Sequence, residues 1–270
     1  MPRLAPVALL LAALAAPAPA EEVEVDVELF LAVDVSRSMS PRELEIQRRG
    51  YAEALASDEV VSAIENGPLG RIALTYVEWA GFGSQRVVVD WTLIDGREAA
   101  EAFATRISAH FDDALRRTSI SSAIDYAAES FDDNGYFAAR RVIDVSGDGP
   151  NNAGRPVAHA RDDALAKGIV INGLPLMTKE GLGAEWTLDD LDLYYQACVI
   201  GGPLSFVVPV LSWDRFPTAV RLKLVQELAA APPPDERPRP AQLRLELGPS
   251  YDCMIGEKIW ERLRRDWGFP

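Results

Sequence analysis

The sequence predicts an α/β fold with a doubly wound, mostly parallel six-stranded sheet, helices on both of its faces and one antiparallel edge strand. Two observations predict it. Short apolar runs typical of buried strands alternate along the chain with longer segments whose apolar residues recur at helical spacing. In addition, a glycine-rich connection at residues 80–84 joins the second and third strands. A connection this short makes a hairpin, so we expect the third strand to lie antiparallel at an edge.

The expected elements follow one another as in an alternating α/β chain. The strands are at residues 25–33, 71–79, 85–92, 141–145, 168–174 and 205–210. The helices are at residues 41–56, 96–111, 119–132, 155–167, 188–198 and 213–230. Hydrophobic residues make up 48% of the chain, which is enough for one core, and a chain of this length needs no second domain.

Residues 1–20 have the pattern of a secretory signal peptide. Arg3 precedes an apolar stretch at residues 7–16, and small residues lead to a cleavage point near Ala20. A disordered Ala/Pro tail is the alternative, but it leaves the apolar centre unexplained. We therefore expect a periplasmic or secreted protein whose mature chain has no membrane span, since no later segment approaches the ~20 apolar residues that a span requires.

The chain is strongly acidic. Its formal net charge is −14, and removal of Arg3 with the leader makes the mature value −15. Nucleic acid and anionic lipid are themselves negatively charged, so both are poor partners for this protein. Acidity also favours a cation site, although the solubility of an exported protein accounts for most of it.

We expect one domain over residues 21–230, followed by a proline-rich linker and a C-terminal segment over residues 231–270. The prolines between residues 232 and 240 end the last helix because they favour a stiff, extended backbone. Beyond them, Ile255, Ile259, Leu263 and Trp267 recur at four-residue intervals, as on one face of a helix. This stripe suits docking on a partner or on the domain, and the neighbouring Cys253 favours the domain.

The chain has two cysteines, Cys198 and Cys253. Disulfides persist in the compartments that an exported protein reaches, so we expect these two cysteines to pair. The pair would tie the C-terminal segment to the domain. The alternative is two buried free thiols.

Three oxygen-bearing side chains follow the first predicted strand at alternate positions, namely Asp34, Ser36 and Ser38. In extended chain, alternate side chains share a face, so these three can converge as the backbone leaves the sheet. One carboxylate and two hydroxyls suit Mg²⁺ or Mn²⁺ better than zinc. The alternative is that the serines only end the strand and cap the next helix, whose first turn carries Pro41 and Glu43.

Two further segments favour the metal site. Thr118 precedes the helical pattern at residues 119–132, and Asp148 follows the predicted strand at residues 141–145 beside two glycines. Asp144 offers another carboxylate, but it should lie inside the strand. Open α/β sheets bind ligands in the crevice beyond the carboxyl ends of their strands, where both Thr118 and Asp148 are expected.

These three segments resemble the metal-ion-dependent adhesion site (MIDAS) of the von Willebrand factor A (VWA) domain family, over roughly residues 23–230. The resemblance implies that Asp34, Ser36, Ser38, Thr118 and Asp148 hold one divalent ion, Mg²⁺ or else Mn²⁺ or Ca²⁺. It also implies an exported interaction module whose ion binds an Asp or Glu of an unidentified partner protein. Ser121 departs from the family pattern, which usually has glycine there. Residues 198–203, the strand after them and the leader are similar to the DUF1194 group of exported bacterial proteins.

Specificity for a partner would come from loops around the ion. The candidates for contact are Arg37, Met39, Asn151, Asn152 and Phe82. The two asparagines could instead cap the following helix, and Phe82 could pack against the domain.

Two other functions stay open. A metal-dependent hydrolase such as a phosphoesterase would also use an Asp-rich site, but the chain has no DxDxT, no GxxxxGKS and no GxSxG motif. Its two histidines, His110 and His159, fall in helical patterns without a metal-ligand cluster. The other possibility is a VWA scaffold that binds partners without a metal.

Overall fold

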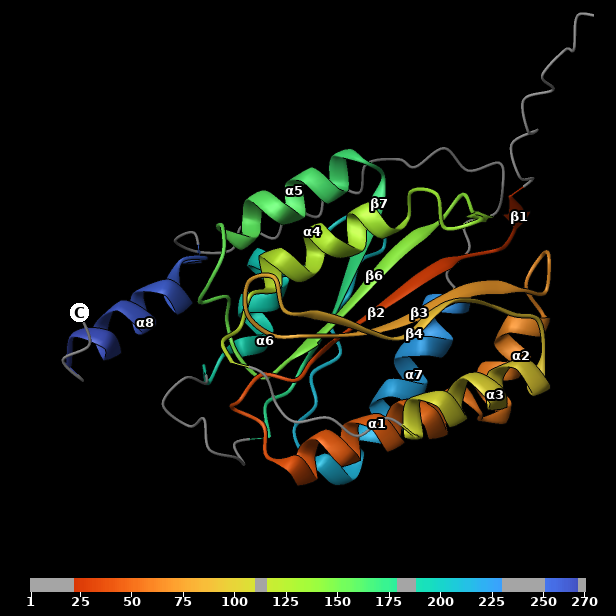
Figure 1. Ribbon diagram of the computed structural model, residues 1–270, viewed down its shortest axis with the longest axis horizontal. Helices are drawn as coiled ribbons and strands as arrows, with labels where there is room; N and C mark the ends of the chain where they lie inside the picture. Colours follow the sequence, from red (N-terminus) through yellow and green to blue (C-terminus); the bar gives the residue numbers. More distant parts are fainter. Residues whose placement is uncertain (1–21, 110–115, 179–187, 230–250, 267–270) are drawn as a thin grey trace, which may run out of the picture.

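A five-stranded sheet in the order β4-β3-β2-β6-β7 runs through the centre of the computed structural model (Figure 1). The structure describes residues 22–109, 116–178, 188–229 and 251–266. The strands are β2 (Glu28–Asp34), β3 (Ile72–Trp79), β4 (Gln85–Ile94), β6 (Arg141–Gly147) and β7 (Ile169–Pro175). All neighbours pair in parallel except β3 and β4, which are antiparallel. A separate two-stranded sheet pairs β1 (Val23–Glu24) with β5 (Tyr136–Phe137).

This architecture confirms the predicted α/β fold and its antiparallel edge strand, with one difference in strand number. The segment at residues 205–210 runs beside β7 but forms only the isolated bridges Gly173–Val207 and Leu176–Val210. Pro175 explains the interrupted ladder, because it has no N–H group to donate between the bonds that Gly173 and Met177 donate to residues 206 and 210.

Helices cover both faces of the sheet. They are α1 (Pro41–Leu55), α2 (Asp58–Glu65), α3 (Arg97–Ser108), α4 (Ile120–Ser130), α5 (Val157–Ala166), α6 (Leu191–Tyr194), α7 (Phe216–Ala229) and α8 (Ile255–Asp266). A π-helical turn, η1 (Tyr195–Val199), continues α6, and a 3-10 turn, η2 (Trp213–Arg215), precedes α7. Sequence reasoning missed α2, although Ser57 caps it by accepting the N–H of Val60. No helix in the described part of the chain is long and apolar enough to cross a membrane.

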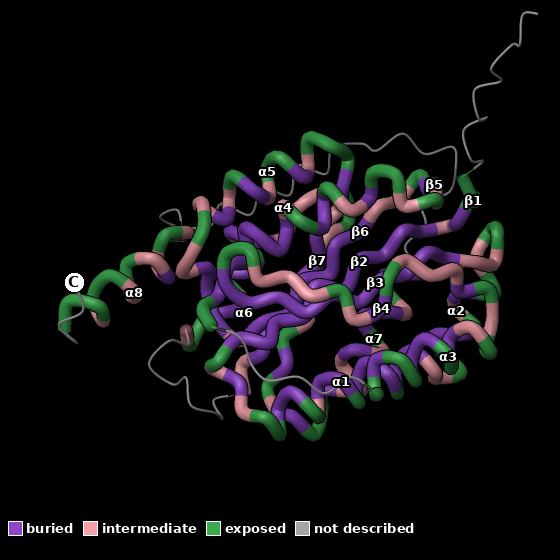
Figure 2. Tube along the Cα trace, viewed as in Figure 1, coloured by how far each residue is buried: buried purple, intermediate pink, exposed green. Residues whose placement is uncertain are grey.

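The central strands are buried from both sides (Figure 2). On one face α1, α2, α3 and α7 pack against alternate residues of β2 such as Leu29 and Leu31. On the other face α4, α5 and η1 pack against Phe30 and Ala32. Because both faces are covered, β2 is apolar at nearly every position, as parallel strands usually are.

A cluster of three charged side chains is buried between β6 and α7. Lys223 Nζ lies 2.6 Å from Asp144 Oδ1 and 2.5 Å from Glu227 Oε1, and Glu227 also accepts a hydrogen bond from Asn172 at 2.9 Å. Two carboxylates share one ammonium group here, and Arg140 donates to the backbone carbonyl oxygen of Glu227. Burial raises the pKa of Asp144 to about 7. The positive charge of Lys223 lowers this pKa, and the negative charge of Glu227 raises it. Asp144 thus lies inside the strand, as expected.

The C-terminal segment joins the body through a disulfide between Cys198 of η1 and Cys253, which confirms the predicted pairing. Ile255 packs at the edge of the core formed by α4, α5 and η1, and Gly256 is buried. The rest of α8 extends beyond the body (Figure 1). Trp267, the proline-rich linker and residues 1–20 lie outside the described residues, so the domain limits and the leader stay predictions.

Loss of the disulfide is expected to lower the free energy of unfolding. The bond closes a loop of 54 residues (a separation of 55, less one), and chain entropy assigns such a loop roughly 4 kcal/mol. Urea denaturation of Cys253→Ser should show a loss of that order. Intact mass should rise by two hydrogens on reduction, and two alkylatable thiols in the untreated exported protein would contradict the pairing.

Substitution of Lys223 tests the buried charged group. Lys223→Met leaves Asp144 and Glu227 without their cation, so the free energy of unfolding should fall by about 3–5 kcal/mol near pH 8. A buried carboxyl group whose folded pKa is raised contributes stability at low pH and loses it as pH rises through that pKa. The loss should therefore shrink near pH 5. Lys258→Met, which removes an exposed pair with Asp252, should cost little, and an equal loss in both variants would contradict the account.

Candidate metal centre

Asp34 is the last residue of β2 and is fully buried. Its carboxylate Oδ1 accepts the N–H of Ser36 at 2.6 Å, which turns the chain out of the sheet. Its carbonyl oxygen accepts a hydrogen bond from the buried amide of Gln47 on α1 at 2.8 Å. The position of Asp34 is thus fixed by the end of the strand and by the helix that follows.

Ser36, Ser38 and Asp148 form a hydrogen-bonded chain beside Asp34. The hydroxyl oxygens of Ser36 and Ser38 lie 2.9 Å apart, and Ser38 donates to Asp148 Oδ1 at 2.8 Å. Ser38 and Asp148 are separated by 110 residues in the sequence. The parallel pairing of β2 with β6 joins them, because it brings the carboxyl ends of both strands to one edge of the sheet.

The helix that follows is capped by a different serine. Ser40 accepts the N–H of Glu43, and the Glu43 side chain accepts the N–H of Ser40, which makes a complete capping box. The alternative interpretation, in which the serines after Asp34 serve only as caps, therefore applies to Ser40. The hydroxyls of Ser36 and Ser38 remain directed at each other and at Asp148.

Thr118 is held near these residues by hydrogen bonds of its backbone to Asn152. Its N–H donates to Asn152 Oδ1 at 3.1 Å, and its carbonyl accepts the N–H of Asn152 at 2.9 Å. Ser119 is the residue that caps α4, by accepting the N–H of Ser122. No hydrogen bond in the described part of the chain joins the Thr118 side chain to Asp34, Ser36, Ser38 or Asp148, so its role as a ligand stays a prediction.

The two carboxylates carry no compensating charge. Burial raises the pKa of Asp34 well above its usual value, repulsion from Asp148 raises it further, and the N–H of Ser36 opposes both. Burial likewise raises the pKa of Asp148 to about 6. The hydrogen bond from Ser38 lowers this pKa, and the negative charge of Glu43 raises it. Among the described residues neither carboxylate forms an ion pair with a lysine or arginine. The pair is therefore a place where a cation gains electrostatic energy.

One oxygen of Asp34 has no partner. Asp34 Oδ2 is buried without a hydrogen bond, and so is the hydroxyl of Tyr195 in η1. Gly147 keeps this space open, because a Cβ atom there would lie 3.0 Å from Asp34 Oδ2 and 2.8 Å from the Tyr195 oxygen. A buried carboxylate oxygen without a donor is costly unless an unobserved group satisfies it, and a metal ion does so.

The donors available suit a hard cation. The described residues contain no group of three or more His, Cys, Asp or Glu side chains that could hold a metal. An ion at this place would therefore have two carboxylates and otherwise neutral hydroxyls as ligands. Such an oxygen set fits Mg²⁺, Mn²⁺ or Ca²⁺.

The five predicted partner contacts differ in how exposed their side chains are. Arg37 and Phe82 are exposed, the latter at 77%, so both can touch another protein. Met39 and Asn151 are buried, at 3% and 0% exposure, so neither side chain reaches the surface, and Asn152 is half-buried. Met39 packs in the core against α1 and its neighbours. The burial follows from tertiary packing that the short sequence motif does not encode.

The two asparagines hold the loops together and do not cap α5, whose N-cap is Pro156 without a side-chain hydrogen bond. Asn151 Oδ1 accepts the N–H of Ser121 in the first turn of α4 at 3.0 Å. Its amide nitrogen donates to Glu257 of α8 at 2.7 Å. Together with the pair between Asn152 and Thr118, these bonds join three segments of the site.

The base of α8 lies against the same loops. Arg117, next to Thr118, stacks over the Trp260 ring with its guanidinium carbon 4.1 Å from the ring centroid. Gly256 lies so close that a Cβ atom there would be 2.1 Å from the Asn151 carbonyl oxygen. Sequence reasoning missed Tyr195, Gly147 and these contacts because they join segments that lie far apart along the chain.

A family described as "Protein of unknown function (DUF1194)" matches residues 24–232. No curated protein matches the chain. Several solved structures have a similar fold. Proximal thread matrix protein 1 from the mussel byssus aligns with a TM-score of 0.56 at 16% identity, over 78% of this chain and 49% of that one. Another structure of the same protein, described as having a zinc-occupied MIDAS motif, aligns with a TM-score of 0.53 at 19% identity and the same coverage.

A von Willebrand factor type A protein from Catenulispora acidiphila aligns with a TM-score of 0.52 at 15% identity, over 76% of this chain and 43% of that one. The chain thus spans about half or less of the length of these proteins. Identities this low establish a shared fold and nothing finer. The family match covers most of the chain, so the protein belongs to the DUF1194 family and has the fold of a VWA domain.

Proposed function

We propose that the protein is an exported interaction module that holds a divalent cation and uses it to bind an acidic group of a partner protein. Asp34, Ser36, Ser38, Thr118 and Asp148 would hold the ion, directly or through water. The observation that carries the proposal is Asp34 Oδ2, a buried carboxylate oxygen without a partner beside a second carboxylate. The zinc-occupied MIDAS described for the mussel protein of similar fold supports the same chemistry.

The ion would supply a positive charge at the edge of the sheet. The two carboxylates of Asp34 and Asp148 would neutralise this charge only in part when either of them binds the ion through water. An Asp or Glu of the partner would then gain a charge-assisted bond there. Mg²⁺ is the first choice among the ions, with Mn²⁺ or Ca²⁺ as alternatives.

Exposed groups near the site would give the partner its second contact. Phe82 lies in the connection between β3 and β4, whose residue Ala80 accepts the N–H of Ser119 at 2.7 Å. This bond ties the connection to the start of α4, next to Thr118. Arg37, between the two serines of the site, is exposed as well. Together they would favour a partner with an acidic group beside an apolar surface.

The hydrolase alternative receives less support. His159, the histidine within the described residues, is exposed on α5. Within the described residues no hydrogen bond joins a histidine to the hydroxyl of Ser36 or Ser38, so no base is positioned there. Screening phosphoesters with Mg²⁺ or Mn²⁺ would revive the hydrolase if turnover disappeared in Asp34→Ala.

Calorimetric titration with Mg²⁺, Mn²⁺ and Ca²⁺ tests the ion. Wild-type protein and the control Asp162→Ala, which changes an exposed carboxylate on α5, should each bind one ion, and Asp34→Ala should bind none. A pull-down of exported proteins should recover a partner that chelator and Asp34→Ala both remove. An unchanged ion site in Asp34→Ala, or no binding by wild type, would contradict the proposal.

Asp34→Asn should separate stability from binding. The amide keeps the acceptor for the Ser36 N–H and removes a buried charge that repels Asp148. Without metal, the free energy of unfolding should therefore rise by on the order of 1 kcal/mol at neutral pH, while ion binding is lost. Thermal unfolding in chelator measures the first effect, and added Mg²⁺ should stabilise wild type only. A destabilised Asp34→Asn would show that the carboxylate serves the fold.

A further inference from the structure

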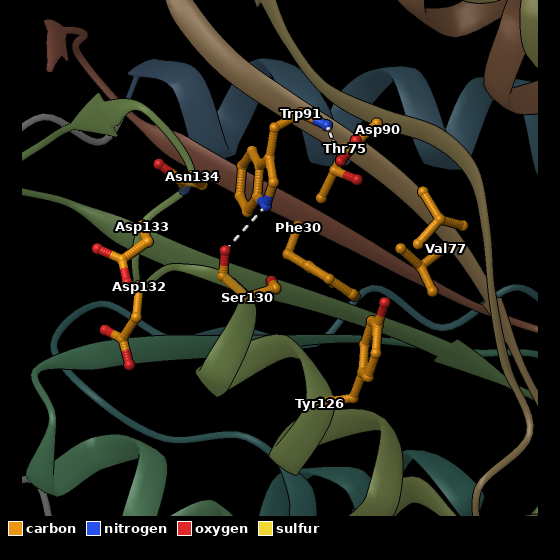
Figure 3. Close-up of a pocket in the computed structure, with 11 residues that line it drawn as sticks. Phe30, Thr75, Val77, Asp90, Trp91, Tyr126, Ser130, Asp132, Asp133 and Asn134 are labelled. Atoms are coloured by element: carbon orange, nitrogen blue, oxygen red, sulfur yellow. Dashed lines mark hydrogen bonds between the residues drawn. The ribbon is translucent and has the colours of Figure 1, made fainter. Parts of the chain in front are cut away.

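A second concave site lies on the face of the sheet that α4 covers, at the edge formed by β3 and β4 (Figure 3). The cavity has a volume of about 310 Å³, at the lower end of the range for small-molecule sites. None of the residues that line it belongs to the candidate metal centre. We propose that this cavity binds a small organic cation of the alkylated ammonium class.

Three aromatic rings from different elements form the apolar wall: Phe30 of β2, Trp91 of β4 and Tyr126 of α4 (Figure 3). Phe30 packs edge-to-face against both of the others, with ring centroids 6.2 Å apart in each pair. The Trp91 indole N–H donates to the carbonyl of Ser130 at 3.0 Å. This bond fixes the ring and satisfies its only donor, so the indole can attract a ligand only through its π system.

Three carboxylates complete the lining: Asp90, Asp132 and Asp133. Among the described residues, no lysine or arginine lines the cavity. Within the described residues none of the three carboxylates forms an ion pair, so the cavity has a negative charge that a cationic ligand would balance.

The backbone is irregular where it forms this wall. Adjacent residues of a regular strand point to opposite faces, yet Asp90 and Trp91 both line the cavity. The pairing of β3 with β4 shifts register between Leu74 and Val77, which is a β-bulge, and bulges redirect side chains in this way. Asp133, on the opposite side, has a positive φ of 57°. Both irregularities thus occur at acidic residues of the lining.

The combination selects one class of ligand. Aromatic faces attract a cation through the ring quadrupole, and alkyl groups on nitrogen fill apolar space better than a bare ammonium does. An anion would be repelled by the carboxylates. A neutral apolar molecule would cover them without compensating their charge, which costs free energy. An alkylated ammonium compound satisfies both the rings and the carboxylates.

Choline and its neutral carbon isostere, 3,3-dimethyl-1-butanol, form a matched pair of probes. Both are titrated into the wild-type protein while the Trp91 indole N–H resonance, assigned with Trp91→Phe, is followed by NMR. Choline should shift this resonance to saturation, and the isostere should bind at least about tenfold more weakly. Asp34→Ala should leave choline binding unchanged, because the metal centre shares no residue with the cavity.

Variants of the lining locate the site. Tyr126→Leu should weaken choline binding roughly twofold to thirtyfold, the range expected for loss of one cation–π contact. Asp132→Asn combined with Asp133→Asn should weaken it further, whereas Glu53→Gln, an exposed carboxylate on α1, should have no effect. Equal affinity for the isostere, no saturable shift of Trp91, or unchanged binding in the lining variants would each overturn the proposal. The last result would indicate non-specific attraction to an acidic protein.

Discussion

The parallel pairing of β2 with β6 is the constraint on which the rest of the structure depends. It sets the carboxyl ends of the two strands side by side, in a sheet that helices cover on both faces. Asp34 and Asp148 come together only for this reason, since more than a hundred residues separate them. The same pairing brings Gly147 beside Asp34, and the missing Cβ leaves room for the unpartnered carboxylate oxygen.

The carboxylate inside β6 and the two carboxylates at the strand ends differ in how their charge is compensated. On the face toward α7, Asp144 has the ammonium group of Lys223 within 2.6 Å. Beyond the carboxyl ends of β2 and β6, Asp34 and Asp148 have hydroxyl and N–H donors from Ser36 and Ser38 but no ion pair among the described residues. A structure that neutralises one buried carboxylate within its own chain and leaves two others without a counter-charge is poised for an external cation. The contrast also explains why Asp144, although close in sequence, takes no part in the site.

Much of the fold could be predicted because β2, β3 and β6 are apolar runs with clear ends. The convergence of Ser36 and Ser38 could be predicted because alternate residues after a strand share a direction. What could not be predicted depends on packing between distant segments. Met39 looks like a surface residue beside Arg37 but lies in the core. Tyr195 reaches the site through a π-helical turn, and α8 reaches it through a disulfide. The aromatic cavity required a β-bulge that leaves no signal in the sequence.

Anomalous X-ray scattering from crystals grown with Mn²⁺ would test the central claim most directly, because it locates the ion without reference to any variant. The account predicts one strong peak within bonding distance of Asp34 Oδ2, on the side of Ser38 and Asp148. A peak at another acidic group, or none in the presence of Mn²⁺, would contradict it.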